Sequence, residues 1–171
     1  MTPTLQLLDR PPAGAPAVPH PDAMWATLKP AAETSSGRVD HVYNVEYVRW
    51  LDMLGQRHLA ELGWHTDNLL ASGGMWFVAR HEIDYRLEAK PGETLIAATW
   101  VRSLRRVKSW RDVMVWRPDP EGWQLVCTAA TLWVHVDLDT RRGTRPPADM
   151  VDAMAPLGAD APPWAQSVGR R

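Results

Sequence analysis

Hydrophobic positions recur along this chain with two different periods, and the change of period separates one helix from a series of strands. Over residues 44–62, apolar side chains such as Tyr47, Leu51 and Leu54 stand three or four positions apart, which is the spacing of one face of an α-helix. Gly63 follows the periodic stretch and suits the left-handed turn that often ends a helix. The pattern predicts one long amphipathic helix.

Beyond this helix the period falls to two. Ile83, Tyr85 and Leu87 alternate with charged residues, a pattern typical of a strand with one buried face. Further runs, separated by Pro, Gly and charged residues, predict strands over 94–103, 108–117 and 123–137, with an earlier strand over 24–29. A run of strands after one helix favours an antiparallel α+β fold in which the helix packs on the sheet.

Both ends of the chain lack this periodicity. Residues 1–23 are rich in Pro and Ala, and the last segment is rich in Ala, Pro and Gly. We therefore expect a flexible N-terminal arm over 1–23 and a flexible C-terminal tail over 151–171. A single domain over 24–150 remains, which fits a chain of 171 residues.

The charge of the chain is almost balanced, with 19 basic and 20 acidic residues. This balance argues against bulk attraction to nucleic acid or to an anionic membrane. The sequence shows neither the features of a secretory signal nor an apolar run long enough to span a membrane. The single cysteine, Cys127, excludes an intrachain disulfide framework. We expect a soluble cytoplasmic protein with no nucleic-acid or membrane partner.

The start of the predicted helix carries a dense group of polar residues, Asp40, His41 and Asn44. Because the first backbone N–H groups of a helix have no intrahelical partner, a helix N-terminus can polarise a carbonyl or bind an anion. Asp40 and His41 are candidates for moving a proton beside it. A purely structural interpretation stays open, in which Asp40 or Asn44 caps the helix and His41 packs beneath the loop.

Other patterns that carry chemistry are weak. The pair Ser35-Ser36 lacks the context of a nucleophile elbow. The histidines do not form a spaced metal-binding motif, and no glycine-rich phosphate loop is present. We expect no metal and no bound cofactor.

Five residues around the helix start share the order and spacing of a known signature: His41, Val42, Asn44, Tyr47 and Trp50. The signature reads roughly D-x-x-G-H-V-N-N-x-x-Y-x-x-W. Together with the segments at 83–85 and 91–93, they make the chain resemble the hotdog-fold thioesterases of the 4-hydroxybenzoyl-CoA type and the related acyl-ACP thioesterases. The resemblance covers about residues 24–150.

This resemblance implies a hotdog fold, in which an antiparallel β-sheet wraps a long central helix. It implies hydrolysis of acyl-CoA or acyl-ACP thioesters, without a metal, by a homodimer or homotetramer with active sites between subunits. The backbone N–H groups of Asn44 and Val45 would hold the oxyanion, and coenzyme A or phosphopantetheine would enter only as part of the substrate. We expect Tyr47 and Trp50 to line the substrate pocket.

The chain departs from the signature at the catalytic carboxylate. The usual aspartate falls at Gly37, and a carboxylate occurs three residues later at Asp40. We interpret Asp40 as the base or nucleophile, His41 as its assistant and Asn44 as the group that orients water or the carbonyl. Glu33 is an alternative carboxylate if the loop carries an insertion.

A basic cluster spans the predicted turn near residue 106: Arg102, Arg105, Arg106, Lys108 and Arg111. Such a run is commonly a solvated turn. Under the resemblance it becomes a clamp for CoA phosphates or a docking surface for an acidic carrier protein, since guanidinium groups bind phosphate bidentately. We assign this role to Arg105, Arg106 and Lys108.

Two alternatives to hydrolysis stay open. The first is a hotdog protein that binds acyl thioesters or assembles with partners without cleaving them, and Gly37 at the position of the usual aspartate favours it. The second is hydration of an enoyl thioester, but the chain has no D-x-x-x-x-H arrangement to support it. The ten tryptophans suit core or subunit-interface packing, or an apolar substrate tunnel. Tunnel candidates are Trp50, Trp76, Trp100 and Trp110, and interface candidates on the strands are Trp100, Trp110, Trp116 and Trp133.

Overall fold

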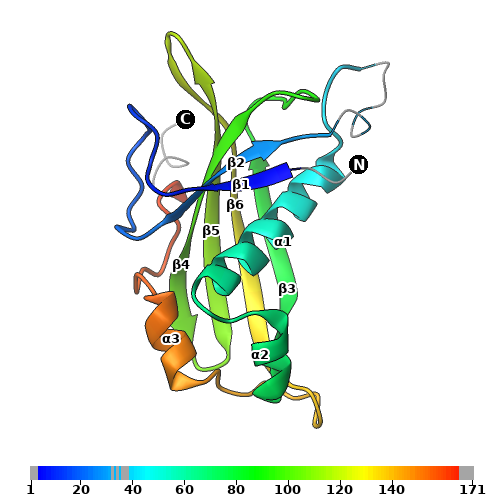
Figure 1. The fold of residues 1–171 in the computed structure, drawn as a ribbon, viewed down its shortest axis with the longest axis vertical. Coiled ribbons are helices and arrows are strands. Elements are labelled where there is room, and N and C mark those ends of the chain that lie inside the picture. The colour runs from blue at the N-terminus through cyan, green and yellow to red at the C-terminus, as the bar shows by residue number, and fades with distance from the viewer. Residues whose placement is uncertain (1–3, 32, 34, 36–38, 166–171) are drawn as a thin grey trace.

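A long helix lies across one face of a six-stranded antiparallel sheet (Figure 1). The computed structural model describes residues 4–31, 33, 35 and 39–165. The helix is α1 (Asn44–Glu61), and the strand order is β1-β2-β4-β5-β6-β3. This arrangement confirms the α+β prediction and the wrapped helix expected of a hotdog fold.

The strands bracket the predicted runs, with one notable extension. Their bounds are β1 (Thr4–Leu8), β2 (Met24–Lys29), β3 (Gly74–Tyr85), β4 (Leu95–Arg105), β5 (Lys108–Asp119) and β6 (Gly122–Asp137). Two short helices are α2 (Thr66–Ala71) and α3 (Ala148–Met154). β3 begins at Gly74, well before the alternating stretch. The pattern does not reveal this start, because Phe77, Val78, Ala79 and Arg80 are all exposed and show no alternation.

The inner face of the sheet packs against α1. Tyr47, Trp50, Leu51 and Leu54 are buried on the helix and belong to one core cluster with residues of β2, β4, β5 and β6. Burying an aliphatic or aromatic side chain of this size stabilises a fold by roughly 1.5–3 kcal/mol. At Gly55 a Cβ would lie 3.1 Å from Cζ2 of Trp133. The glycine therefore allows α1 to approach the sheet closely.

The ends of α1 follow different local rules. The helix begins at Asn44 with Tyr43 as the extended N-cap, and no side chain caps it. The predicted capping role of Asn44 is therefore wrong, because Asn44 is already helical. At the other end Gly63 takes φ +85°, and its N–H donates to the Ala60 carbonyl at 2.9 Å. This confirms the predicted left-handed end.

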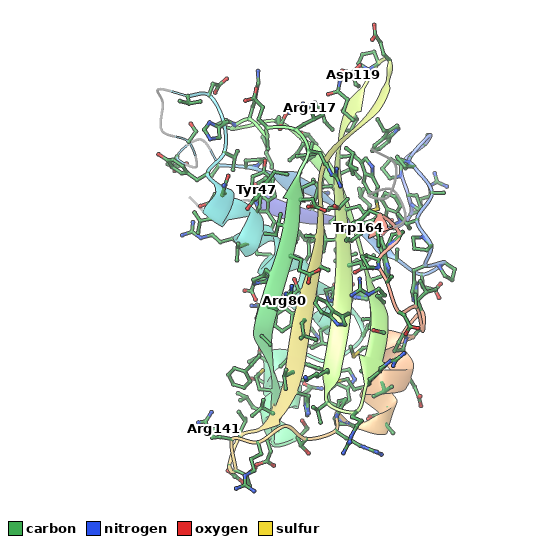
Figure 2. All side chains as sticks on the ribbon, turned by 180° about the vertical axis from the view of Figure 1, so that it is seen from behind. Tyr47, Arg80, Arg117, Asp119, Arg141 and Trp164 are labelled. Carbon is green, nitrogen blue, oxygen red and sulfur yellow. The ribbon has the colours of Figure 1, made fainter. Side chains whose placement is uncertain are left out.

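The outer face of the sheet is covered by the N-terminal segment and the tail. Trp25 stacks on Trp116 with ring centroids 5.7 Å apart, and Trp100 is fully buried in the same cluster. Leu8 and Trp164 pack against this cluster (Figure 2). Trp100 and Trp116 are therefore core residues of one chain, which corrects their assignment to a subunit interface.

The two segments predicted as flexible carry regular contacts where they are described. β1 replaces part of the arm expected over 1–23, because its short strand pairs with β2 along its whole length. In the tail, Leu157 donates its N–H to the Val101 carbonyl at 3.0 Å, and Ala159 donates to the Arg102 carbonyl at 3.2 Å. These two bonds attach the tail to β4, which corrects the expectation of a loose tail at these positions.

Among the described residues, no helix combines the length and the apolar character needed to cross a bilayer.

Candidate active site

The polar residues of the signature lie directly before α1 and in its first turn. Asp40 is exposed, while His41 is partly buried and its N–H donates to the Val39 carbonyl at 2.7 Å. Asn44 is exposed at the first helical position. Gly37, where the family's aspartate would fall, lies outside the described residues.

The first backbone N–H groups of α1 are available to a ligand. Within the described part of the chain, neither Asn44 nor Val45 donates its N–H to another group, whereas the Glu46 N–H already donates to the Tyr43 carbonyl at 2.9 Å. The positive end of the helix dipole adds to these donors. The geometry therefore offers two adjacent N–H groups that can donate hydrogen bonds to an oxyanion.

Tyr47 and Trp50 anchor the start of α1 through their buried side chains. The Tyr47 hydroxyl accepts a hydrogen bond from the Ala89 N–H at 3.1 Å, and Val42 donates its N–H to the Ala89 carbonyl at 2.8 Å. Burial raises the pKa of Tyr47 to about 12. Both aromatic side chains are almost fully buried in the core, so they position the loop rather than line a pocket as the sequence suggested.

The basic cluster separates into two kinds of residue. Arg105, Arg106 and Lys108 are exposed at the β4–β5 turn, as a phosphate-binding role requires. Arg102 and Arg111 are buried on opposite faces of the sheet. The prediction of one solvated basic turn is therefore corrected for these two, because strand residues near a hairpin point into both faces.

The exposed part of the cluster has contacts of its own. Arg105 pairs with Asp160 of the tail, and Arg106 and Arg145 line a small pocket of about 200 Å³. This turn lies at the opposite end of the molecule from the start of α1 (Figure 1). One chain alone therefore does not bring the predicted basic residues to the predicted catalytic residues.

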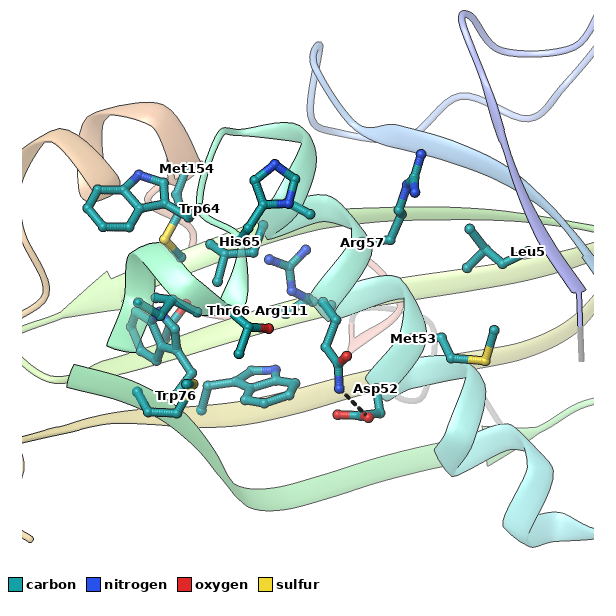
Figure 3. Close-up of a pocket in the computed structure, with 18 of the residues that line it drawn as sticks. Leu5, Asp52, Met53, Arg57, Trp64, His65, Thr66, Trp76, Arg111 and Met154 are labelled. Carbon is teal, nitrogen blue, oxygen red and sulfur yellow. Dashed lines mark hydrogen bonds between the residues drawn. The ribbon is translucent and has the colours of Figure 1, made fainter. Parts of the chain in front are cut away.

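A large cavity lies beside the C-terminal half of α1 (Figure 3). Its volume is about 900 Å³, and α1, α2 and strands of the sheet contribute to its wall. The aromatic and cationic residues of the wall include Trp64, Trp76, Trp133, Arg57 and Arg111. Asp40, His41 and Asn44 do not line it. Of the tryptophans predicted for a tunnel, Trp76 is the one that faces this cavity.

Sequence reasoning did not identify this cavity. One of its carboxylates, Asp52, accepts a hydrogen bond from Nε2 of Gln56 at 2.7 Å. The helical period marks Gly55 and Leu59 as inward-facing, but it does not show that the space beside them stays open. Among the residues that the structure describes, no three His, Cys, Asp or Glu side chains converge to hold a metal ion.

Comparison with known families places the whole chain. A family described as the thioesterase-like superfamily matches residues 36–154. The chain belongs to the thioesterase-like superfamily. The resemblance drawn from the helix-start signature is thereby confirmed, and thioester hydrolysis is the activity that this superfamily indicates.

Solved structures share the fold of this superfamily member at low sequence identity. The 4-hydroxybenzoyl-CoA thioesterase from Pseudomonas sp. strain CBS-3 has a TM-score of 0.69 and 20% identity, covering 77% of this chain and 98% of that one. A Staphylococcus aureus protein solved in complex with CoA has a TM-score of 0.73 and 13% identity, covering 88% and 94%. These matches establish the hotdog fold.

A third structure is longer than this thioesterase-superfamily chain. It is a Lactobacillus plantarum protein provisionally described as an oleoyl thioesterase, with a TM-score of 0.73 and 15% identity. The match covers 83% of this chain, and this chain spans about half of that protein (54%). Comparison with curated proteins gives no significant match.

Proposed function

We propose that this member of the thioesterase-like superfamily hydrolyses acyl-CoA thioesters to a carboxylate and free CoA. The observation that carries the proposal is the pair of unengaged N–H groups of Asn44 and Val45 at the start of α1, in register with the family signature. CoA is favoured over a carrier protein because related structures contain CoA or act on CoA thioesters by name. Acyl-ACP and a cytoplasmic location stay predictions.

The proposed reaction begins when the thioester carbonyl oxygen accepts hydrogen bonds from these two N–H groups. Asp40, assisted by His41, takes a proton from water as the water oxygen bonds to the carbonyl carbon. The C–S bond then breaks, and the leaving thiolate takes up the proton that Asp40 holds. Loss of one such oxyanion donor costs roughly 10²–10³ in rate in other acyl-transfer enzymes.

The exposed edge of β3 supports assembly through that strand. β3 pairs with β6 on one side, and in the described chain no strand covers the other side. Phe77, Val78 and Tyr85 are large apolar residues exposed along it, and an uncovered apolar edge favours pairing with a second copy. We propose a homodimer in which two β3 strands pair in antiparallel register.

Such pairing would complete the site from two subunits. In an antiparallel pair centred near Ala79, Gly74 of one subunit lies opposite Tyr85 of the other. Tyr85 contacts Tyr47 in the first turns of α1, with ring centroids 5.0 Å apart, whereas Trp76 lines the large cavity. The start of α1 would therefore face the cavity and the basic turn of the partner subunit. The CoA role of Arg105, Arg106 and Lys108 rests on this assembly.

Substitution of Asp40 tests the proposed base. Asp40→Asn is expected to lower kcat on an acyl-CoA substrate by 10² or more, within the roughly 10²–10⁴-fold range of general acid–base catalysis, with little change in KM. Asp119→Asn, on the distant β5–β6 turn (Figure 2), is the matched control. Thiol release from the added substrate gives the rate.

Asp52→Asn sharpens the same experiment, because Asp52 is a carboxylate of the cavity that the partner's α1 would face. Near-normal turnover in Asp40→Asn, together with a loss in Asp52→Asn, would move the base to Asp52. Binding of acyl-CoA by the wild-type protein without release of thiol from any acyl group would instead favour the non-hydrolytic binding or assembly protein.

A further inference from the structure

A buried arginine faces the large cavity without a counter-ion. Arg111 on β5 lines the cavity (Figure 3) and is 5% exposed. Its Nη1 donates to Nδ1 of His58 at 2.5 Å and to Oγ1 of Thr99 at 3.3 Å. His58 accepts as a neutral ring, because burial and the neighbouring Arg111 lower its pKa to about 2. Both protein partners are therefore uncharged.

The adjacent carboxylate, Asp112, favours the charged form of Arg111 through space but forms no ion pair with it on the cavity side. Asp112 follows Arg111 in the strand, so its side chain points to the other face of the sheet. There it pairs with Arg102 at 3.0 Å. None of the described carboxylates forms an ion pair with Arg111, and its Nε and Nη2 have no hydrogen-bond partner in the described chain. A buried cation in this state is costly unless an anion joins it.

A second donor of the same cavity lacks an acceptor. Trp133 lines the cavity, and its indole N–H is buried without a partner among the described residues. The indole lies against Gly55, as does the Arg111 side chain, whose Nε would be 3.7 Å from a Cβ at that position. Arg111 and Trp133 therefore meet at one place beneath α1. Donors concentrated there call for a ligand that brings acceptor oxygens.

Most of the remaining wall of the cavity is apolar, and its polar members include the carboxylates of Asp52 and Asp67. Its apolar members include Leu59, Leu69, Met75, Trp76 and Met154. A ligand that satisfies both regions has an apolar body and a negatively charged oxygen group at its far end. A carboxylate matches the guanidinium best, because the two groups form charge-assisted and often bidentate hydrogen bonds.

We propose that the cavity holds the acyl group of the substrate and that Arg111 binds a carboxylate at its distal end. The preferred substrates would then be ω-carboxyacyl thioesters, with Arg111 and Trp133 as specificity-determining residues. This inference rests on the proposed thioesterase function, since it names the substrate class of that same site.

The first experiment compares substrates on the wild-type protein. A homologous series of ω-carboxyacyl-CoA thioesters is set against unbranched acyl-CoA thioesters of equal carbon number. We expect kcat/KM to favour the carboxylated member roughly 10- to 100-fold at the best length, the range of one hydrogen bond to a charged group. Equal kcat/KM across every matched pair would overturn the proposal.

Variants of Arg111 assign that preference to the guanidinium. Arg111→Met should lose the 10- to 100-fold preference, because kcat/KM should fall further on the carboxylated substrate than on the unsubstituted acyl-CoA, and Arg111→Lys should keep part of it. Arg10→Met, on the exposed N-terminal segment, is the control for loss of a positive charge. A preference that survives in a folded Arg111→Met protein, or an equal loss on both substrates, would refute the assignment.

A binding measurement separates this inference from the thioesterase proposal. Free dicarboxylic acids should raise the Tm of the wild-type protein above the shift given by monocarboxylic acids of equal length, because a ligand that binds the folded state stabilises it. This readout needs neither turnover nor a folded Arg111 variant. A Tm shift with dicarboxylic acids but no thioester hydrolysis would refute only the proposed hydrolase function. Hydrolysis without that Tm shift would refute the proposed carboxylate site at Arg111.

Discussion

Two buried titratable residues on the sheet and on α1 oppose each other in their response to pH. His58 is 7% exposed, and burial together with Arg111 and His20 lowers its pKa from 6.5 to about 2. Asp112 is fully buried, and burial raises its pKa from 3.8 to about 7 despite Arg102 and Arg111. His58 therefore resists protonation in the folded state, whereas Asp112 takes up a proton there at a higher pH than an ordinary carboxyl group does.

These shifts predict opposite pH slopes of stability. Between pH 7 and pH 5 the unfolded state protonates His58 while the folded state does not, so His58 lowers the free energy of unfolding by about 2 kcal/mol as the pH falls. Over the same range folded Asp112 takes up a proton that the unfolded state does not bind, which raises that free energy by about 2 kcal/mol. The two contributions nearly cancel in the wild-type protein.

Single variants expose each contribution. His58→Gln should gain stability relative to wild type as the pH falls from 7 to 5, and Asp112→Asn should lose it. Urea unfolding at the two pH values measures both slopes, with Asp119→Asn at the β5–β6 turn as the control. Identical slopes in the two buried-site variants would contradict this account.

At the scale of elements, the Tyr47 hydroxyl links the first turn of α1 to the loop after β3. The Ala89 N–H is buried with Tyr47 as its acceptor. The periodic spacing of Tyr47 predicted its inward orientation, but its partner lies far away in sequence and no local pattern reveals it. The same holds for the cavity, whose wall is drawn from separate helices and strands.

Tyr47→Phe removes this acceptor and leaves a buried N–H unpaired. The free energy of unfolding should fall by about 1–3 kcal/mol, the desolvation cost of such a group. Tyr43→Phe, at an exposed ring just before the helix, is the matched control. Chemical denaturation measures both, and an unchanged stability in Tyr47→Phe would show that the Ala89 N–H finds another acceptor.

The sequence predicted α1, four of the strands around it and the composition of its first turn, because each shows a local period or a compact signature. It did not predict β1, since five residues in a Pro- and Ala-rich region carry too little alternation. It also left the first part of β3, before the alternating residues, without a strand assignment. An edge strand whose residues are exposed on both faces lacks the alternation on which strand prediction depends.

At the scale of the whole molecule, that exposed edge of β3 is where a second subunit is expected. A proline there removes a backbone donor and disrupts pairing without disturbing the sheet interior. Ala79→Pro should therefore yield a folded protein of half the wild-type mass in solution, with most thioesterase activity lost because the two-subunit site is broken. Ala79→Ser is the control.

Sedimentation velocity reports the mass, and far-UV circular dichroism reports the fold. A variant that stays dimeric while folded would rule out β3 as the interface. A folded monomer with full activity would confine the active site to one subunit and remove the argument for a shared cavity.

The segment before β2 and the tail after α3 together seal the back of the sheet over Trp25, Trp100 and Trp116. A third or fourth copy of the chain would need that surface to stack sheet against sheet, and it is already occupied from within. We therefore do not expect further copies to stack on this face of the pair joined along β3.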